Sequence, residues 1–369
     1  MSQSTVPTTN VPTRVSVELP TTVGLDLSDK HGHFHVQRGD GRKLAVGKVP
    51  LTRDELTKLF THWSGCRLVI EASCQSAWID RLAQACTMEV LVANPRRVEL
   101  LTKSDRKTDA TDAELLAEMG RTNPKLLGPI THRSQETQAH LAILRARDVL
   151  VSNRTMLINH VRGVLKTHGV RVPSMSSESF GGRVLVSIPS ELTAALQPLL
   201  CVLQTINLQI KTCDKTLVSL AEEHYPIVKL LQQIGGVGPL VSLAFVLMIA
   251  DPQRFRNSRD VAAYFGLVPR KQSSGKRDPQ LHITKAGDRA MRRLLVLAAN
   301  YILGRFGPDC DLRRFGLKIA GEGTDKTAKK KARVAVARKL AVLMHHLWRT
   351  GEEYDPFYLA KKRGEPLAA

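Results

Sequence analysis

Residues 22–28 read TVGLDLS, a short apolar segment that carries one carboxylate, Asp26, between Leu25 and Leu27. Its apolar and β-branched residues, followed by a polar turn segment, predict a strand. An unpaired charge is costly to bury in such a strand, so Asp26 needs a compensating partner. This segment therefore predicts both a sheet and a functional carboxylate within it.

Further short elements follow along the chain. The same reasoning predicts a turn and three more strands at residues 29–32, 33–37, 67–71 and 89–93. Apolar residues at helical spacing predict helices at residues 76–86 and 108–120. Strands that alternate with helices predict an α/β layer whose sheet is partly parallel.

Three more carboxylates stand where they can join Asp26. Glu71 ends the apolar stretch LVIE, so its side chain can stand at the carboxyl edge of the same sheet. Asp109 and Asp112 are three residues apart on a predicted helix and therefore share a face. If that helix packs on the sheet, all four carboxylates converge.

Four converging acids repel one another, and a pair of Mg²⁺ ions, with Mn²⁺ as the alternative, is their natural counter-charge. Such a site activates an oxygen nucleophile and stabilises the departing oxygen of a phosphodiester. Three of these acids also have a non-catalytic explanation. Asp109 and Asp112 can interact favourably with the helix dipole at a helix N-terminus, and Glu71 can be a surface residue. Asp26 is the hardest to explain without a function, because its neighbours are apolar residues or glycine.

Two long segments with helical periodicity, residues 137–166 and 191–223, occupy the middle of the chain. The second carries a stripe of apolar side chains: Leu196, Leu199, Leu203, Ile206, Ile210, Leu217 and Leu220. A connection rich in Pro, Ser and Gly at residues 173–182 lets the two form a helical hairpin or coiled coil. A core helix pair and a subunit-joining arm fit this pattern equally well.

The charge of the chain is strongly unbalanced. It has 54 Lys and Arg against 34 Asp and Glu, which gives a net charge of +20 and a pI near 10.0. Residues 254–363 hold 26 basic and 10 acidic residues, so +16 of the surplus lies there. Such a surplus attracts polyphosphate, so nucleic acid is the leading partner and this end should bind it. A basic scaffold without catalytic activity is the less specific alternative.

Cysteine usage and hydropathy predict the compartment. The six cysteines form no CxxC pair and no zinc-ligand pattern, so we expect neither disulfides nor zinc, and a reducing cytosol. The longest apolar run, residues 240–250, is about half of the roughly 20 residues that cross a bilayer. The N-terminus has no charged start followed by an apolar segment, so neither a signal peptide nor a membrane partner is expected.

A glycine-rich turn, IGGVGP at residues 234–239, precedes the apolar run. It looks like a helix-hairpin-helix turn, in which Gly236 and Gly238 let the backbone approach phosphates and the next helix offers free N–H groups. Gly-rich turns between helices are also common structural elements, and the sequence leaves both explanations open.

The segment FGLVPRKQSSGKR at residues 265–277 places two hydroxyls, Ser273 and Ser274, among cations. The candidate nucleic-acid contacts around them are Arg270, Lys271, Lys276, Arg277, Lys285, Arg292 and Arg293. A serine in this setting can simply contact phosphate. As a nucleophile it would form a serine–DNA ester that keeps the energy of the broken strand, while Arg270, Lys271 and Lys285 stabilise the charged transition state.

Together these motifs resemble a known family. Asp26, Glu71 and the segment KTDATDA at residues 107–113 are similar to the Asp-Glu-Asp-Asp site of RuvC-like domains, in particular that of the DEDD transposases of the insertion-sequence one-ten family. The segments GLVPR at residues 266–270 and ITKAG at residues 283–287 are similar to the C-terminal domain of that family. There the serine before a glycine is catalytic, which maps to Ser274, with Ser273 as the neighbouring candidate.

The resemblance also implies the domain organisation. It implies an α/β RNase H-like (RuvC-like) domain, a helical coiled-coil arm and a mainly α-helical transposase domain with the helix-hairpin-helix-like turn and the serine. With two tails, the expected ranges are 1–18 (disordered tail), 19–131 (RuvC-like), 132–232 (arm), 233–363 (transposase domain) and 364–369 (tail).

The activity that the resemblance implies is DNA cleavage and rejoining in the bacterial cytoplasm, at the nucleoid. The expected partners are double-stranded donor and target DNA and a structured guide RNA, the bridge or seek RNA, encoded by the element. A composite site built from two protomers implies a dimer that becomes a tetramer on nucleic acid. The alternative is a hydrolytic RNase H-fold nuclease or Holliday-junction resolvase, which uses the same four carboxylates with water as the nucleophile.

Overall fold

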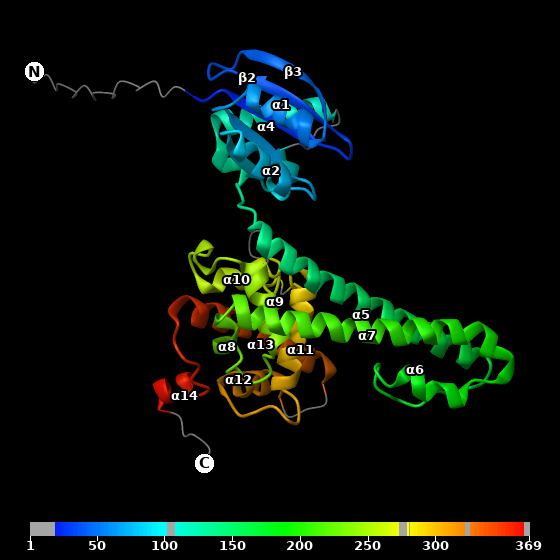
Figure 1. The fold of residues 1–369 in the computed structure, drawn as a ribbon. Coiled ribbons are helices and arrows are strands. Elements are labelled where there is room, and N and C mark those ends of the chain that lie inside the picture. The colour runs from blue at the N-terminus through cyan, green and yellow to red at the C-terminus, as the bar shows by residue number, and fades with distance from the viewer. Residues whose placement is uncertain (1–18, 102–107, 273–278, 280, 322–324, 365–369) are drawn as a thin grey trace, which may run out of the picture. The chain divides into compact units, whose positions relative to one another are not determined.

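The structure is a computed structural model of the 369-residue chain and describes residues 19–101, 108–272, 279, 281–321 and 325–364. The chain divides into two compact units, residues 1–132 and 133–369. Figure 1 shows their elements. Within the described residues, no helix is both long enough and apolar enough to span a bilayer.

A five-stranded sheet with the order β3-β2-β1-β4-β5 forms the centre of the first unit. Its strands are β1 (Thr22–Leu27), β2 (His31–Gln37), β3 (Lys43–Pro50), β4 (Arg67–Glu71) and β5 (Glu89–Ala93). β1 is antiparallel to β2 and parallel to β4, and β4 is parallel to β5. The predicted partly parallel sheet is confirmed, and β4 and β5 have the predicted bounds.

Helices cover both faces of this sheet. They are α1 (Arg53–His62), α2 (Ser76–Ala85), α3 (Pro95–Leu101) and α4 (Asp109–Thr122), with a 3₁₀ turn at Pro124–Leu127. Leu25 and Ile70 share a core with Phe60 of α1 and Ile79 of α2. Val69, on the opposite face, packs with Leu116 of α4. The first unit is therefore a layered α/β fold in which alternate residues of each strand face different helices.

Two elements of this unit, β3 and α1, lie outside the predicted set. β3 is an edge strand whose Leu44 and Val46 are 48% and 55% exposed, so its hydrophobic alternation is weak. α1 buries only Leu56 and Phe60. The start of α1 does have a local sequence signal, because Thr52 caps it by accepting a hydrogen bond from Glu55 N.

The second unit begins with the predicted pair of long helices, α5 (Gln135–Thr167) and α7 (Thr193–His224). Figure 1 shows them side by side as a hairpin. Arg147 pairs with Asp214, and Arg154 Nη1 donates to Asn207 Oδ1 over 3.1 Å. The two contacts are seven residues apart on α5 and seven residues apart, in the opposite direction, on α7. The antiparallel register is thus constant over two helical turns.

The apolar stripe of α7 is paired within the same chain. Leu196 and Leu203 form a core with Val161 and Leu165 of α5 and with Phe180 of the short helix α6 (Phe180–Arg183). Leu217 lies in the next core along the hairpin. Since these side chains are buried against α5, the stripe offers no exposed face to a second subunit.

Six further helices form one core with the base of the hairpin. They are α8 (Ile227–Leu231), α9 (Pro239–Ile249), α10 (Ser258–Tyr264), α11 (Arg289–Ile302), α12 (Asp311–Ala320) and α13 (Lys326–Thr350), with a 3₁₀ turn at Pro252–Arg254. Residues 242–249 of α9 are all buried at the centre of this core. Leu144 and Leu217 of the hairpin join this core, so the arm and the C-terminal helices are structurally continuous.

The last helix, α14 (Tyr358–Arg363), is held by hydrogen bonds from Leu359 N and Ala360 N to Asp311 of α12. Two more 3₁₀ turns, Val184–Ser187 and Ser190–Leu192, lie in the connection between α5 and α7 and contribute to the core at the hairpin tip.

Candidate functional site

Strand register places Asp26 beside Glu71. In the parallel pair of β1 and β4, Leu25 lies opposite Ile70, and Asp26 and Glu71 each come one residue later. Side chains two residues apart in a strand share a face, so Asp26 shares a face with Gly24 and Glu71 with Val69. This is the face that α4 covers, and both carboxylates stand at its carboxyl end.

Gly24 allows α4 to approach this face closely. A Cβ atom at this position would lie 2.1 Å from the carbonyl oxygen of Ala113 and 2.5 Å from the backbone nitrogen of Ala117. α4 therefore crosses β1 at Ala113, one residue after Asp112. The first turn of α4, with Asp109 and Asp112, consequently lies near Asp26.

The start of α4 is fixed by its own sequence. Thr108 is the N-cap, and its side chain accepts a hydrogen bond from Thr111 N over 3.2 Å. The Thr111 hydroxyl in turn accepts one from Thr108 N over 3.0 Å, which completes a capping box. This cap determines which residues form the first turn, and so it places both aspartates.

The electrostatics of Asp26 agree with this geometry. Its side chain is half-buried. Burial raises the pKa of Asp26, and the charges of Asp112 and Asp109 raise it further, while His33 and a backbone hydrogen bond from Leu27 lower it. Three of the four predicted carboxylates are therefore close enough to repel one another, and Glu71 stands on the same face in register with Asp26.

His33 is a member of this site that the sequence did not point to. It lies opposite Asp26 in the antiparallel pair of β1 and β2, and its Nδ1 is 3.4 Å from Asp109 Oδ2. The available signal was the short turn between the first two strands, which sets this pairing. A neutral imidazole here leaves the excess negative charge of the site uncompensated, whereas a protonated one partly offsets it.

The acidic residues fit divalent cations. Carboxylate oxygens are the ligands that Mg²⁺ and Mn²⁺ prefer, and a cation removes the repulsion at Asp26. All four acids lie in the described part of the chain, yet no three of them bring ligand atoms within 4.8 Å of one another.

The segment with the serines lies in the second unit, and its two ends are held together. Pro269 and Ile283 pair as an antiparallel bridge. Arg270 N donates to His282 O, and Thr284 N to Val268 O, each over 2.9 Å. The predicted site residues Ser273, Ser274, Lys276 and Arg277 lie outside the described residues.

The predicted cations near this segment fall into two groups. Arg292 Nη1 donates to the carbonyls of Phe265, Ala286 and Gly287 at 3.2, 2.7 and 3.0 Å, and Arg293 pairs with Asp148 of α5. These two guanidinium groups therefore support the protein itself. Arg270, Lys271 and Lys285 are exposed and remain available to a ligand.

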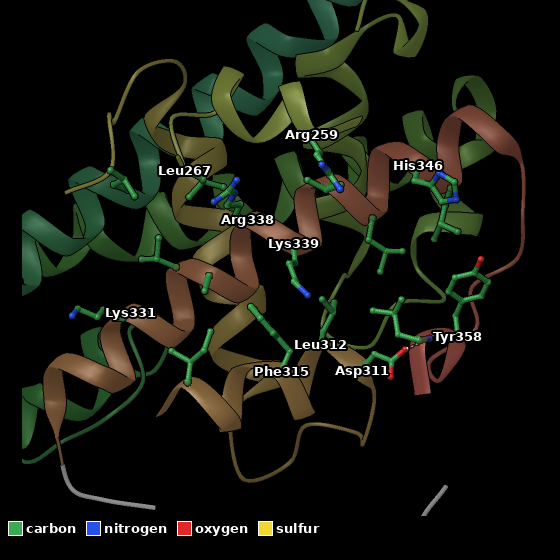
Figure 2. A pocket seen from close by; sticks show the side chains of 18 of the residues that line it. Arg259, Leu267, Asp311, Leu312, Phe315, Lys331, Arg338, Lys339, His346 and Tyr358 are labelled. Carbon is green, nitrogen blue, oxygen red and sulfur yellow. Dashed lines mark hydrogen bonds between the residues drawn. The ribbon is translucent and has the colours of Figure 1, made fainter. Parts of the chain in front are cut away.

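A groove of about 1470 Å³ opens beside the base of the serine segment, between α12, α13 and the C-terminal residues (Figure 2). Phe315 and Leu343 are among its apolar lining residues. Its cationic lining residues are Arg259, Lys285, Lys330, Lys331, Arg338 and Lys339. Figure 2 shows Lys331 at the opposite end from Asp311 and Tyr358, with Arg338 and Lys339 between them. The acidic lining residues are Asp311, Glu352, Glu353 and Asp355.

Lys339 is partly buried in this groove. Its Nζ lies 3.7 Å from the centroid of the Phe315 ring, a cation–π contact. Burial lowers the pKa of Lys339, and the nearby charge of Arg363 lowers it further, while Asp311 raises it. A lowered pKa means that these surroundings disfavour the charged form of the Lys339 amine.

The glycine-rich turn lies between α8 and α9, and its two predicted contact glycines, Gly236 and Gly238, differ in their surroundings. Gly236 has φ +88°, and a Cβ there would lie 2.9 Å from Tyr301 Cδ1 and 3.2 Å from Ala298 O of α11. Gly238 is exposed with nothing within 4 Å. The structural explanation therefore accounts for Gly236, while Gly238 alone leaves its backbone open to a ligand.

The chain is similar to two transposase families. Residues 23–169 match the DEDD transposase family of IS110 elements, described as "Transposase", and residues 228–313 match the family described as "Transposase IS116/IS110/IS902 family". The first match contains Asp26, Glu71, Asp109 and Asp112, and the second contains the whole serine segment.

Individual relatives agree with this result. The chain is 30% identical to the transposase for insertion sequence element IS1111A of Coxiella burnetii, over 71% of each chain. It is 30% identical to a probable family 20 transposase of Pseudomonas aeruginosa, over 76% of this chain and 83% of the relative. It is 28% identical to the transposase for insertion sequence element IS1328 of Yersinia enterocolitica, over 77% and 84%. The chain therefore belongs to the IS110 family of insertion-sequence DEDD transposases and is an enzyme of DNA transposition.

Proposed function

We propose that this transposase cleaves and rejoins DNA through a serine–DNA intermediate, with Ser274 as the nucleophile and element-encoded RNA as the guide. The observation that carries the proposal is the convergence of Asp26, Asp109 and Asp112 beside Glu71 on one face of a β3-β2-β1-β4-β5 sheet. This strand order supports an RNase H-like first unit. The four carboxylates would hold two Mg²⁺ ions, which lower the pKa of a bound hydroxyl and neutralise phosphate charge when present.

The residues of the chain divide the work. The oxygen of Ser274 attacks the phosphorus, a bond from Oγ to phosphorus forms, and the bond to one deoxyribose oxygen breaks. The serine loses its proton, and the departing oxygen gains one and becomes a hydroxyl. Rejoining reverses these changes with a different DNA hydroxyl. Arg270, Lys271 and Lys285, all exposed beside this segment, would hold the phosphate and stabilise the transition state.

A serine hydroxyl is a poor nucleophile at neutral pH, so it needs the carboxylate site to act. The two sites lie in different units of the chain, and we propose that the carboxylates of one protomer meet the serine of another. Double-stranded donor and target DNA are the substrates. The cationic groove would hold phosphates of DNA or guide RNA without reading their sequence, which leaves specificity to RNA pairing.

The decisive experiment is denaturing electrophoresis of end-labelled DNA after reaction with wild type, Ser273→Ala and Ser274→Ala. The wild type should form a protein–DNA species that survives denaturant and disappears on protease treatment, and Ser274→Ala should form none. Loss of the adduct with Ser273→Ala alone moves the nucleophile by one residue. Cleavage without any wild-type adduct would favour the hydrolytic nuclease instead.

Removal of a carboxylate should stop the same step. Asp26→Ala, Glu71→Ala, Asp109→Ala and Asp112→Ala should each lose strand cleavage and still bind DNA, because each removes a ligand and also some negative charge near phosphate. The loss in Ser274→Ala with Asp26→Ala should not exceed that in either alone, since the residues act as one unit. Full activity in EDTA would exclude the metal site. Sequencing of the RNA that copurifies with the protein tests the guide.

A further inference from the structure

A second cluster of metal-ligating side chains lies in the second unit, at the base of the hairpin. Glu136, His140 and His224 each bring one ligand atom within 4.8 Å of the others. Within the described residues, this is the one such group of three. It is separate in sequence and chemistry from the four carboxylates, because two of its three members are imidazoles.

The hairpin register explains why these residues meet. Glu136 and His140 are four residues apart in the first turns of α5 and so share a face. His224 ends α7, and the antiparallel pairing brings this end beside the start of α5. Arg147 with Asp214 continues the same register further along the hairpin. The cluster therefore rests on two rigid helices, which hold ligands more closely than loops do.

The distances within the cluster are close to those of a metal site. His224 Nδ1 lies 3.3 Å from Glu136 Oε1, and the rings of His140 and His224 are 5.2 Å apart between centroids. Ligands bound at about 2.0–2.1 Å in a tetrahedral zinc site stand roughly 3.3–3.4 Å from one another. Glu223 Oε2, 3.8 Å from His224 Nε2, is a further carboxylate at the edge of the cluster.

Tyr225 orients one of the imidazoles. His140 Nδ1 and Tyr225 Oη are 2.8 Å apart, which leaves His140 Nε2 for another partner. The phenol oxygen can accept a hydrogen bond from Nδ1–H. Metal-binding histidines commonly use their second nitrogen in this way.

A hydrogen-bonded surface cluster without a cation would also place Glu136 near a helix start and His224 near a helix end. It does not require the hydrogen bond with Tyr225 that fixes the ring of His140. We propose that Glu136, His140 and His224 bind a divalent transition metal of the zinc class, which links the two ends of the hairpin. Two imidazoles and one carboxylate suit zinc, whereas Mg²⁺ prefers oxygen ligands alone. This proposal replaces our expectation of a chain without zinc, which rested on cysteine spacing.

The site is accessible to an ion. Glu136 and His224 are exposed and His140 is partly buried. Ligand exposure and the open fourth position allow zinc to enter from solvent without unfolding of the hairpin. The proposal concerns a structural site, so its test does not require strand cleavage and can fail independently of the proposed function.

The test is calorimetric titration of the purified full-length chain with Zn²⁺. An Asp26→Ala background with excess Mg²⁺ keeps zinc from the carboxylate site. This chain should bind one Zn²⁺, and His224→Ala and Glu136→Gln should each lower the affinity by about 100-fold or more. Tyr225→Phe, which removes only the outer hydrogen bond, should lower it by about 10-fold. His160→Ala is the matched control, since His160 is an exposed histidine on α5, the helix that carries Glu136 and His140.

Thermal unfolding separates loss of the ligand from loss of the fold. The parent in this test is the Asp26→Ala chain. Without zinc, His224→Ala and His160→Ala made in that chain should unfold at the same temperature as the parent. Added Zn²⁺ should raise the midpoint of the parent and of His160→Ala but not that of His224→Ala. Equal zinc affinity in the parent and His224→Ala overturns the proposal, as does a parent that binds no zinc.

Discussion

At the scale of single residues, Asp26 is a proposed metal ligand whose negative charge lowers the stability of the fold. The raised pKa means that Asp26 holds its proton more tightly in the folded chain than in the unfolded chain. The free energy of unfolding therefore falls as pH rises from the ordinary pKa of Asp, about 3.9, through the raised pKa of folded Asp26. Above the raised pKa, ionised Asp26 destabilises the fold by its full amount, and below both pKa values it does not destabilise the fold.

This leads to a prediction for Asp26→Asn. In EDTA the variant should be more stable than wild type near neutral pH, by less than about 1 kcal/mol because solvent screens a half-exposed group. The difference should shrink as pH falls below the raised pKa of Asp26. Unfolding by urea between pH 4 and pH 8 measures it, with Asp54→Asn, an exposed aspartate of α1, as the control. A less stable variant at neutral pH contradicts the repulsion.

Added Mg²⁺ should favour wild type over Asp26→Asn. It should raise the thermal unfolding midpoint of wild type, because a ligand that binds only the folded state stabilises it. It should raise the midpoint of Asp26→Asn much less, since one charged metal ligand is missing. Equal shifts in the two proteins would show that Mg²⁺ binds elsewhere.

The same residue shows how far the site could be predicted from sequence. An isolated acid in an apolar strand can be recognised without a structure, and so can the Asp109 and Asp112 pair on a helix. His33 could not be recognised in this way, because histidines alternate through His31, His33 and His35 and only the cross-strand register selects one. Glu136 and His140 are separated from His224 by more than eighty residues, so only the hairpin register unites them.

At the scale of elements, the position of α4 on the sheet depends on a single absent side chain. Gly24→Val should force α4 away, since even a Cβ would overlap Ala113 O at 2.1 Å. We expect a loss of about 1–3 kcal/mol or more in folding stability. Strand cleavage should fall at least tenfold, because Asp109 and Asp112 move with the helix.

The control for this change is Gly163→Ala in α5. No atom lies within 4 Å of a Cβ at that position, so the substitution should be neutral or stabilise the helix by roughly 0.5–1 kcal/mol. Chemical denaturation and cleavage assays on the same preparations compare the two variants. A Gly24→Val protein with normal cleavage contradicts the placement of α4.

The hairpin supports a second prediction at this scale. Its buried stripe is satisfied within the chain, but Val149 and Met156 of α5 and Leu208 of α7 are 59%, 60% and 60% exposed. Val149 and Met156 are seven residues apart and share a face. If the proposed dimer and tetramer use the arm, Val149→Gln with Met156→Gln should lower the mass of the RNA-bound complex in light scattering without lowering its melting temperature.

A matched substitution tests the specificity of that result. Val186, in the connection between the helices, is 92% exposed, and Val186→Gln should leave the mass unchanged. An unchanged mass in the double variant would show that subunits meet through another surface. The long helices themselves were predictable from their periodicity, whereas the face that stays exposed depends on how the two helices pack.

At the scale of the whole molecule, the net charge of +20 determines how the protein meets nucleic acid. Each phosphate that Lys or Arg neutralises releases counterions, so affinity for RNA and DNA should fall by roughly 10³–10⁵ between 50 and 200 mM salt if 6–10 phosphates are contacted. Filter binding at several salt concentrations measures the slope. An affinity that does not change with salt contradicts the electrostatic explanation.

The lysines of the groove give a more specific prediction about salt dependence. Lys330→Ala with Lys331→Ala should weaken binding of nucleic acid at low salt. It should also reduce the slope of log affinity against log salt concentration by about one for each phosphate that is no longer neutralised. Lys276→Ala with Arg277→Ala should reduce it as well. Lys58→Ala is the control, because Lys58 already pairs with Glu55 over 2.6 Å.

The constant register of the hairpin also sets an order of events while the chain is being made. The ribosome releases α5 first, and α7 emerges from its end near the hairpin tip, so pairing begins at the tip and reaches Leu144 and Leu217 last. Roughly 70 residues separate these two, which at about 5–20 residues per second leaves Leu144 uncovered for roughly 4–14 seconds. During that interval the early half of the arm has an apolar surface and no partner of its own, so the speed of translation decides how long a nascent chain can be captured by a chaperone or by a neighbouring copy.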